Sequence, residues 1–280
     1  MIEQIAKLPR ISLGCYPTPL IYAKHLSEVL GGPNILIKRD DLSGLALGGN
    51  KCRRLEFLLA DARQKGFDSF LISGLSNVSV QLAAAVAKLG FKFTQIIYDA
   101  SPKEKQGNYI LHKILNSDMK VIEPISPDET PDDVTAKRNA ALDSEAVKLR
   151  EEGYNPFVMR AGESIPIENV GWVDAVEEMW QQLKAQNIEA QYLVVTVSQG
   201  STHSGLIVGA KYLRTPFKVI GISEHYARAK VKSEVVRMAS ETAEFLELGV
   251  TITPDEVTVY DEYIGEVHLK PRSYQTGSSN

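Results

Sequence analysis

The sequence predicts an α/β fold, because strand-like and helix-like segments alternate along most of the chain. The strand-like segments are short and rich in β-branched and aromatic residues, and the segments between them carry apolar residues at helical spacing. The composition agrees with this class, since 44% of the residues are hydrophobic and 24% are charged, which are ordinary values for a globular protein. Such alternation is typical of parallel sheets joined by crossover helices.

The alternation runs through two stretches of the chain. In the first stretch, strands are expected at residues 34–40, 68–74 and 92–99, with helices at residues 55–66 and 81–90. In the second stretch, strands are expected at residues 155–162, 192–198 and 217–224, with helices at residues 173–186 and 205–214. The runs DSFLISG, YLVVTVS and FKVIGISE are nearly continuous in apolar residues, as buried parallel strands are.

A charged segment separates the two stretches. Residues 126–153 carry apolar side chains only at helical spacing, which predicts a polar loop followed by a solvent-facing helix. The length of 280 residues is compatible with one large domain or with two lobes. We expect two lobes, a larger one of residues 1–51 plus 161–280 and a smaller one of residues 52–160.

Charge and composition argue against several classes of function. The formal net charge is −4, and acidic and basic residues are interleaved rather than gathered in a basic stripe, so we expect no nucleic-acid partner. No apolar run approaches the ~20 residues that a bilayer requires, and the first residues lack a signal-peptide core, so we expect no membrane association and a cytoplasmic location. Cys15 and Cys52 lack metal-ligand spacing and are expected to be reduced thiols, with no metal site.

A turn of small residues, SQGSTHSG, follows the strand YLVVTVS and opens a helix. Such a turn presents backbone N–H groups at the positive end of a helix dipole, and Ser201 and Thr202 add hydroxyl donors, so a phosphate group fits there. An ordinary strand-to-helix turn with a Ser or Thr N-cap explains the residues equally well. His203 is expected to be structural. The turn has neither the Walker nor the dinucleotide glycine pattern, which favours a phosphate group other than that of a nucleotide.

A second glycine-rich turn leads into the helix that begins near Lys51. The run KRDDLSGLALGGNKCRRLEFLLADA places this lysine directly after two glycines and an asparagine. A lysine held at such a junction is partly desolvated, which lowers its pKa and frees its amine for Schiff-base chemistry. The alternative is a solvated lysine in the first turn of a helix, which is the commoner environment for this residue type.

Several motifs in order along the chain resemble one known family. These are PTPL at residues 17–20, IKRDDLSGLALGGNK at residues 37–51, SN at residues 76–77 followed by QLAAAVAKLG, GN at residues 107–108, and GSTHSG at residues 200–205. Together they resemble the D-cysteine desulfhydrase and 1-aminocyclopropane-1-carboxylate (ACC) deaminase family of pyridoxal-phosphate (PLP) enzymes. The resemblance covers most of residues 10–265 and implies the two-lobed, tryptophan synthase beta-like fold with parallel-rich twisted sheets.

The resemblance implies how PLP is held. Lys51 would carry the Schiff base with the cofactor, while Gly200, Ser201 and Thr202 would hold its phosphate. Arg54, where relatives often have lysine, would add a positive charge near that phosphate. The cofactor would lie in the cleft between the lobes, anchored by the larger one.

The resemblance also implies roles near the substrate. Asn77 would bond the phenolic oxygen of the cofactor, Ser76 would face the substrate carboxylate or a moving proton, and Asn50 would shape the lysine turn. The implied activity is that of a lyase or deaminase that acts on a small amino acid such as D-cysteine or ACC. It would release ammonia and a 2-oxo acid, with sulfide from a thiol substrate. A homodimer is also implied.

The chain departs from the family pattern at two places. Val78 and Val80 stand where the family usually has a polar residue and an arginine, so substrate contacts there are expected to differ. The strings DPVYTGK and HTGG, which family members carry near their C-termini, do not occur, and the chain is expected to be C-terminally shortened. In the family, the first of these strings supplies a tyrosine at the active site, and we do not expect Tyr260, Tyr263 or Tyr274 to replace it. The alternatives are therefore a non-catalytic or impaired PLP-binding paralogue, or a truncated product.

Overall fold

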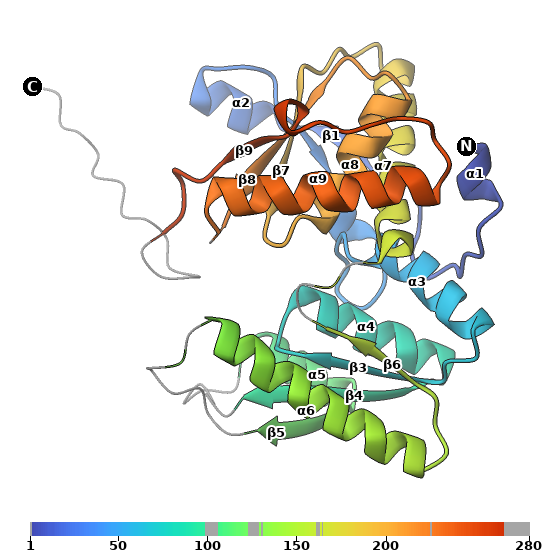
Figure 1. Cartoon of the computed structure of the whole chain (residues 1–280). Helices are drawn as coiled ribbons and strands as arrows, with labels where there is room; N and C mark the ends of the chain where they lie inside the picture. Colours follow the sequence, from blue (N-terminus) through green and yellow to red (C-terminus); the bar gives the residue numbers. More distant parts are fainter. Residues whose placement is uncertain are drawn as a thin grey trace, which may run out of the picture. The chain divides into compact units, whose positions relative to one another are not determined.

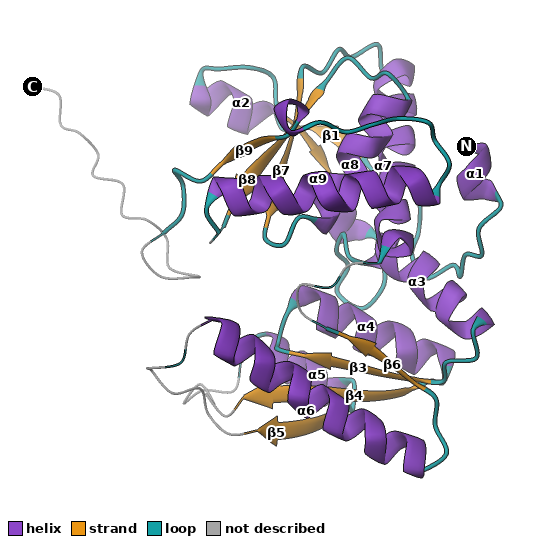
Figure 2. Ribbon diagram, viewed as in Figure 1, coloured by secondary structure: helices purple, strands orange, loops and turns teal. Residues whose placement is uncertain are grey.

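The computed structural model describes residues 2–98, 106–122, 129, 131–160, 163, 165–224 and 226–265 (Figure 1). The chain divides into two compact units, unit 1 of Met1–Leu8 with Ser164–Asn280, and unit 2 of Pro9–Glu163. Both contain parallel sheet with helices between the strands (Figure 2), which confirms the predicted α/β class. In the described part of the chain, no helix has the length and apolar character needed to cross a membrane.

Unit 2 is built on a parallel sheet in the order β5-β4-β3-β6. Its strands are β3 (Ser69–Ser73), β4 (Lys92–Tyr98), β5 (Asp118–Ile122) and β6 (Pro156–Met159). Its longer helices are α3 (Cys52–Gln64), α4 (Asn77–Leu89) and α6 (Pro131–Glu151). Its shorter elements are the antiparallel pair β1 (Leu20–Tyr22) and β2 (Leu36–Lys38), helices α2 (Lys24–Leu30) and α5 (Asn108–Ile114), and a 3-10 turn at Asp40–Leu42.

Helices α4 and α6 cover opposite faces of this sheet (Figure 2). On the α6 side, Leu142, Ala146 and Leu149 pack against Leu71 of β3 and Ile96 of β4. The helix predicted in this part of the chain is present as α6, with one face toward solvent and the other packed on the sheet. The spacing of these apolar residues on α6, four and three apart, aligns them on a single stripe that the sheet buries.

Unit 1 contains a three-stranded parallel sheet in the order β7-β8-β9. Its strands are β7 (Tyr192–Val197), β8 (Lys218–Ser223) and β9 (Thr258–Tyr260). Its helices are α1 (Glu3–Ala6), α7 (Pro166–Ala185), α8 (Ser201–Tyr212) and α9 (Arg228–Phe245), with a 3-10 turn at Pro254–Glu256. Helices α7, α8 and α9 pack against one another, and Trp172 is buried among the core residues of the unit.

The segment of residues 9–51 is held in unit 2 by two buried charged side chains of α3. Glu56 accepts hydrogen bonds from the backbone N–H groups of Leu13 (2.8 Å) and Gly14 (3.0 Å), and Arg53 binds Asp40. Residues 9–51 thus group with residues 52–163 by contact. The division into a cofactor-anchoring lobe of residues 1–51 plus 161–280 and a smaller lobe of residues 52–160 stays a prediction.

Candidate functional site

The turn before Lys51 has a backbone that only glycine accommodates. Gly48 and Gly49 have φ angles of +77° and +132°. A Cβ at Gly48 would overlap the carbonyl oxygen of Asp41, and a Cβ at Gly49 would overlap the side-chain nitrogen of Gln81. The paired glycines that precede Lys51 in the sequence therefore have a steric cause, which is a tight approach to two neighbouring segments.

Hydrogen bonds hold the lysine turn in place from both sides. The N–H of Gly49 donates to the carbonyl of Asp40 (2.9 Å) and to Ser43 Oγ (3.1 Å), while Ser43 Oγ donates to the carbonyl of Gly49 (3.1 Å). Gln81 Nε2, from α4, donates to the carbonyl of Gly48 (3.0 Å). Lys51, half-buried at the N-cap of α3, is thus connected to the 3-10 turn and to α4.

A buried arginine on the first turn of α3 reinforces the same region. Arg53 is 1% exposed, and its Nε and Nη2 atoms each donate to a carboxylate oxygen of Asp40 at 2.8 Å. Nη2 also lies 3.2 Å from Thr18 Oγ1, and the guanidinium stacks over the ring of Tyr16 at 4.4 Å. A bidentate pair of this kind fixes direction as well as distance, so it orients α3 relative to the lysine turn.

Ser76 and Asn77 lie at the start of α4, and the side chains of both are exposed. Ser76 is the N-cap residue and forms a capping box with Ser79. Asn108, at the start of α5, donates from Nδ2 to Asn77 Oδ1 (3.2 Å) and to the carbonyl of Leu75 (3.1 Å). The Gly-Asn motif at residues 107–108 and the Ser-Asn motif at residues 76–77, 31 residues apart in sequence, are therefore brought together.

A buried histidine lies beneath this pair of motifs. His112 Nε2 lies 3.0 Å from Ser79 Oγ, its Nδ1 lies 3.0 Å from Ser117 Oγ, and its ring stacks on Phe93. Burial lowers the pKa of His112 to about 4, so the ring is neutral at pH 7. It supports the α4–α5 contact, and sequence reasoning did not identify it.

The predicted anion-binding turn opens α8 in unit 1. Gly200 is the N-cap residue with φ +104°, and the helical ladder begins with Ser204 N donating to the Gly200 carbonyl (2.8 Å). Ser201 and Thr202 are half-buried in the first turn, where backbone N–H groups precede the ladder and the helix dipole is positive. Ser201 Oγ donates to Asn169 Oδ1 of α7 (2.7 Å), so its proton has a partner within the protein.

The predicted site residues therefore fall into two groups. Unit 2 brings Asn50, Lys51, Arg54, Ser76 and Asn77 onto the lysine turn, the first turn of α3 and the start of α4, and Gln81 links α4 to the turn. The phosphate-binding candidates of unit 1 share the first turn of α8 and are Gly200, Ser201 and Thr202.

The tyrosines considered as substitutes give no structural support for that role. Tyr260 and Tyr263 have exposed side chains in unit 1, and Tyr274 lies outside the described residues.

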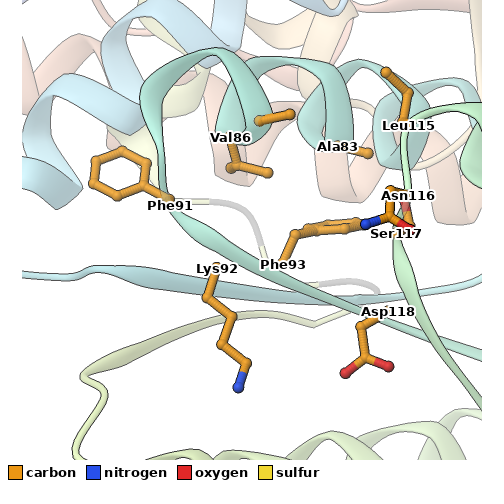
Figure 3. Close-up of a pocket in the computed structure, with 10 residues that line it drawn as sticks. Ala83, Val86, Phe91, Lys92, Phe93, Leu115, Asn116, Ser117 and Asp118 are labelled. Carbon is orange, nitrogen blue, oxygen red and sulfur yellow. The ribbon is translucent and has the colours of Figure 1, made fainter.

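A pocket of about 340 Å³ in unit 2 contains none of the predicted site residues. It lies beside α4 and β4, with Val86 and Phe93 among its apolar lining (Figure 3). The charged ends of Lys92 and Asp118 point away from that apolar lining in Figure 3. Asn116 and Ser117 are the other polar residues of its lining, and neither belongs to the predicted site.

Comparison with known proteins extends these observations over nearly the whole chain. The model of one family, described as pyridoxal-phosphate dependent enzyme, matches residues 11–271. A protein of Pyrococcus abyssi (strain GE5 / Orsay) with the provisional name 1-aminocyclopropane-1-carboxylate deaminase is 31% identical over 263 residues, which are 93% of this chain and 76% of the relative. D-cysteine desulfhydrase of Klebsiella pneumoniae (strain 342) is 32% identical over 278 residues, covering 96% and 80% of the two chains.

Solved structures show the same relationship. The crystal structure of an ACC deaminase homologue superimposes with a TM-score of 0.76 at 31% identity, covering 92% of this chain and 75% of the other. Threonine deaminase isoform 2 from Solanum lycopersicum superimposes with a TM-score of 0.60 at 18% identity, covering 80% and 58%, and shows the fold alone. The fold is tryptophan synthase beta-like, as predicted.

Proposed function

Because the chain belongs to the family of pyridoxal-phosphate dependent enzymes, we propose that it is a PLP-dependent lyase or deaminase that acts on a small amino acid of the D-cysteine or ACC type. The products would be ammonia and a 2-oxo acid, with sulfide from a thiol substrate. The observation that carries the proposal is the position of Lys51 at the end of a turn that Gly48, Gly49 and Gln81 hold in one conformation. The names of the two curated relatives support this substrate class.

The chemistry of the donor set fits the aldehyde, the phosphate and the phenolic oxygen of PLP. Lys51 supplies a primary amine for the aldehyde, and the first turn of α8, with Gly200 at its N-cap, supplies backbone N–H donors for a phosphate. Arg54 would add positive charge near that phosphate, and Asn77 would bond the phenolic oxygen. Ser201 and Thr202 complete the phosphate turn, and Asn50 shapes the lysine turn.

When bound, PLP supplies an electron sink that stabilises negative charge on the substrate carbon next to the amine. The protein's part is to hold and move protons. Lys51 would accept and return a proton at Nζ, a role for which its half-buried position at the N-cap of α3 is suited. Ser76, whose exposed hydroxyl also caps α4, would face the substrate carboxylate or a moving proton.

A non-catalytic PLP-binding relative is the alternative, and it rests on Val78 and Val80 replacing polar residues at the start of α4. The comparisons give no reason to prefer it over the enzyme. We further propose a cytoplasmic location and a homodimeric assembly. Analytical ultracentrifugation of the purified protein measures the oligomeric state.

The experiment records the visible absorption of the purified protein with PLP, before and after borohydride, and locates the reduced cofactor by peptide mass spectrometry. We expect a visible band of lysine-bound PLP and a label on Lys51. Lys51→Ala should abolish the band, while Lys65→Ala, at an exposed lysine just after α3, should leave it unchanged. Wild-type protein without a band, or with a label on another lysine, would contradict the proposal.

Substrate class is then tested on PLP-loaded enzyme that has not been treated with borohydride. A panel of D- and L-amino acids, including D-cysteine and ACC, is assayed for ammonia and 2-oxo acid release. Turnover of at least one member that is lost in Lys51→Ala supports the lyase. Background release from the whole panel, with the band intact, would favour the non-catalytic alternative.

A further inference from the structure

Three helices of unit 1 contact one another around the first turn of α8 (Figure 1). Helix α7 approaches α8 closely because α8 has glycines on the facing side. A Cβ at Gly205 would lie 2.5 Å from the carbonyl oxygen of Asn169, and a Cβ at Gly209 would lie 2.9 Å from Val176 Cβ. On the other side, a Cβ at Gly200 would lie 3.0 Å from Val235 Cγ2 of α9. The start of α8 is therefore confined between α7 and α9.

A chain of buried hydrogen bonds joins the three helices at this level. Thr242 Oγ1 of α9 donates to the carbonyl of Met238 (2.7 Å) and accepts from Asn169 Nδ2 of α7 (2.9 Å). Asn169 Oδ1 in turn accepts from Ser201 Oγ of α8 (2.7 Å). Asn169 is 1% exposed and Thr242 is fully buried, so water does not compete for these bonds.

The direction of each bond follows from the number of protons available. The single hydroxyl proton of Thr242 goes to Met238, so its oxygen can only accept from Asn169. The amide orientation of Asn169 is thereby set, with its oxygen toward Ser201. The single hydroxyl proton of Ser201 is then committed to Asn169, and Ser201 Oγ has only lone pairs to present elsewhere. An anion at this turn would be bound by the backbone N–H groups of the first turn.

We propose that Asn169 is a positioning residue for the cofactor phosphate, anchored by Thr242 and acting through the hydroxyl of Ser201. This inference rests on the proposed function, because it takes the first turn of α8 as the phosphate site. Asn169 accepts the hydroxyl proton of Ser201 and so holds the first turn of α8 in one conformation. The backbone N–H groups of that turn then point toward one phosphate position. It does not itself touch the cofactor.

The test uses Asn169→Asp, which preserves the side-chain volume. A carboxylate still accepts from Ser201, but it cannot donate to Thr242, and it adds a negative charge beside the anion turn. We expect the affinity for PLP to fall about tenfold to a hundredfold. The affinity for pyridoxal, which lacks the phosphate, should stay within about twofold, because its bond to Lys51 lies in unit 2. Both affinities are measured by titrating the visible band of the apoprotein.

The matched control is Asn187→Asp, the same chemical change just beyond the other end of α7. Asn187 is exposed and about 25 Å along the helix from Asn169. Its variant should bind both ligands as the wild type does. Circular dichroism and the melting temperature of each variant show whether the protein is folded.

Three further variants keep the inference testable if Asn169→Asp does not fold. Thr242→Val removes the hydroxyl that binds Asn169 and introduces no charge. It should lower the affinity for PLP several-fold and leave the affinity for pyridoxal unchanged. The effects of Asn169→Ala and Ser201→Ala on PLP affinity should be non-additive, because the Asn169 amide acts through the Ser201 hydroxyl. Additive effects on PLP affinity would mean that Ser201 contacts the phosphate independently, which overturns the inference.

The failures of the inference and of the proposed function are distinguishable. Wild-type protein that forms no band with either ligand would overturn the proposed function. A wild type that binds PLP at Lys51, with Asn169→Asp weakening PLP and pyridoxal equally or weakening neither, would overturn the inference alone.

Discussion

Asp40→Asn should destabilise unit 2 far more than the same change at the neighbouring Asp41. Asp40 accepts both bonds of the bidentate pair with Arg53, whose side chain is 1% exposed. Removing the charge leaves a buried guanidinium without its counter-charge, and such changes cost about 3–5 kcal/mol. With a urea m-value of about 2 kcal/mol/M, a loss of about 3 kcal/mol lowers the unfolding midpoint by about 1.5 M.

Asp41→Asn is the matched control because Asp41 forms a similar fork with Arg39 at the surface. Arg39 Nε and Nη2 donate to the two carboxylate oxygens at 2.6–3.1 Å, but the side chains are 33% and 56% exposed. Solvent screens a pair of this kind, so its loss should cost at most about 1 kcal/mol. The two variants differ by one position in the chain and are otherwise chemically identical.

Urea unfolding followed by far-UV circular dichroism measures both variants. Tryptophan fluorescence separates the units, because both tryptophans, Trp172 and Trp180, lie in α7 of unit 1. Unfolding of unit 2 is the part of the circular dichroism change that tryptophan fluorescence does not follow, and the Asp40→Asn shift should appear in that part. Equal midpoints for Asp40→Asn and Asp41→Asn, within the error of the fits, would refute the argument that burial makes the Arg53 pair stabilising.

Three other predictions concern the same molecule. Burial lowers the pKa of His203 to about 4, so the unfolded state binds a proton between about pH 6.5 and pH 4 that the folded state does not. The free energy of unfolding should therefore fall by on the order of 3 kcal/mol as the pH drops through this range, with no loss from His203 above about pH 6.5. His203→Gln should flatten this part of the stability–pH profile. Gly48→Ala should cost at least about 2 kcal/mol more than Gly66→Ala, because both have positive φ but only the first would overlap backbone; chemical denaturation of the pair decides this. Thiol titration at pH 8 should modify the exposed Cys15 quickly and Cys52 slowly, since burial raises the pKa of Cys52 to about 11; equal rates would contradict this.

The sequence was sufficient for the strands with the strongest apolar runs. The segments DSFLISG, KFTQIIYD, YLVVTVS and FKVIGISE became β3, β4, β7 and β8. Strands β3 and β4 are largely buried on both faces, whereas β7 has exposed side chains at alternate positions. Strand β5 was missed, since its DMKVI segment lies at the sheet edge with mostly exposed or half-buried side chains. Helix α9 was also missed, although its buried residues at positions 231, 235, 238, 239 and 242 follow helical spacing that the sequence displays.

The sequence indicated the two turns of the candidate site but could not supply the side chains that hold them. Two adjacent glycines before Lys51 predicted a tight turn. The steric cause is the backbone of Asp41 at Gly48 and the side chain of Gln81, from α4, at Gly49. Ser201 was predicted to add a hydroxyl donor for phosphate, and the structure gives that proton to Asn169, 32 residues away. Local patterns identify a turn, whereas the partners that orient it depend on tertiary contacts.

The same physical device recurs at both turns. Beside each turn lie polar helix side chains that are at most 5% exposed. They are Arg53 and Gln81 at the lysine turn and Asn169 at the anion turn. Burying such groups has a desolvation cost that apolar residues would avoid, so their net contribution to stability is small. What they add is direction, because a buried hydrogen bond has few alternative geometries. For the uncharged Gln81 and Asn169, removal of the side chain should therefore lower ligand affinity before it lowers global stability. Breaking the charged Arg53–Asp40 pair should lower stability as well, because it leaves a buried charge without its partner.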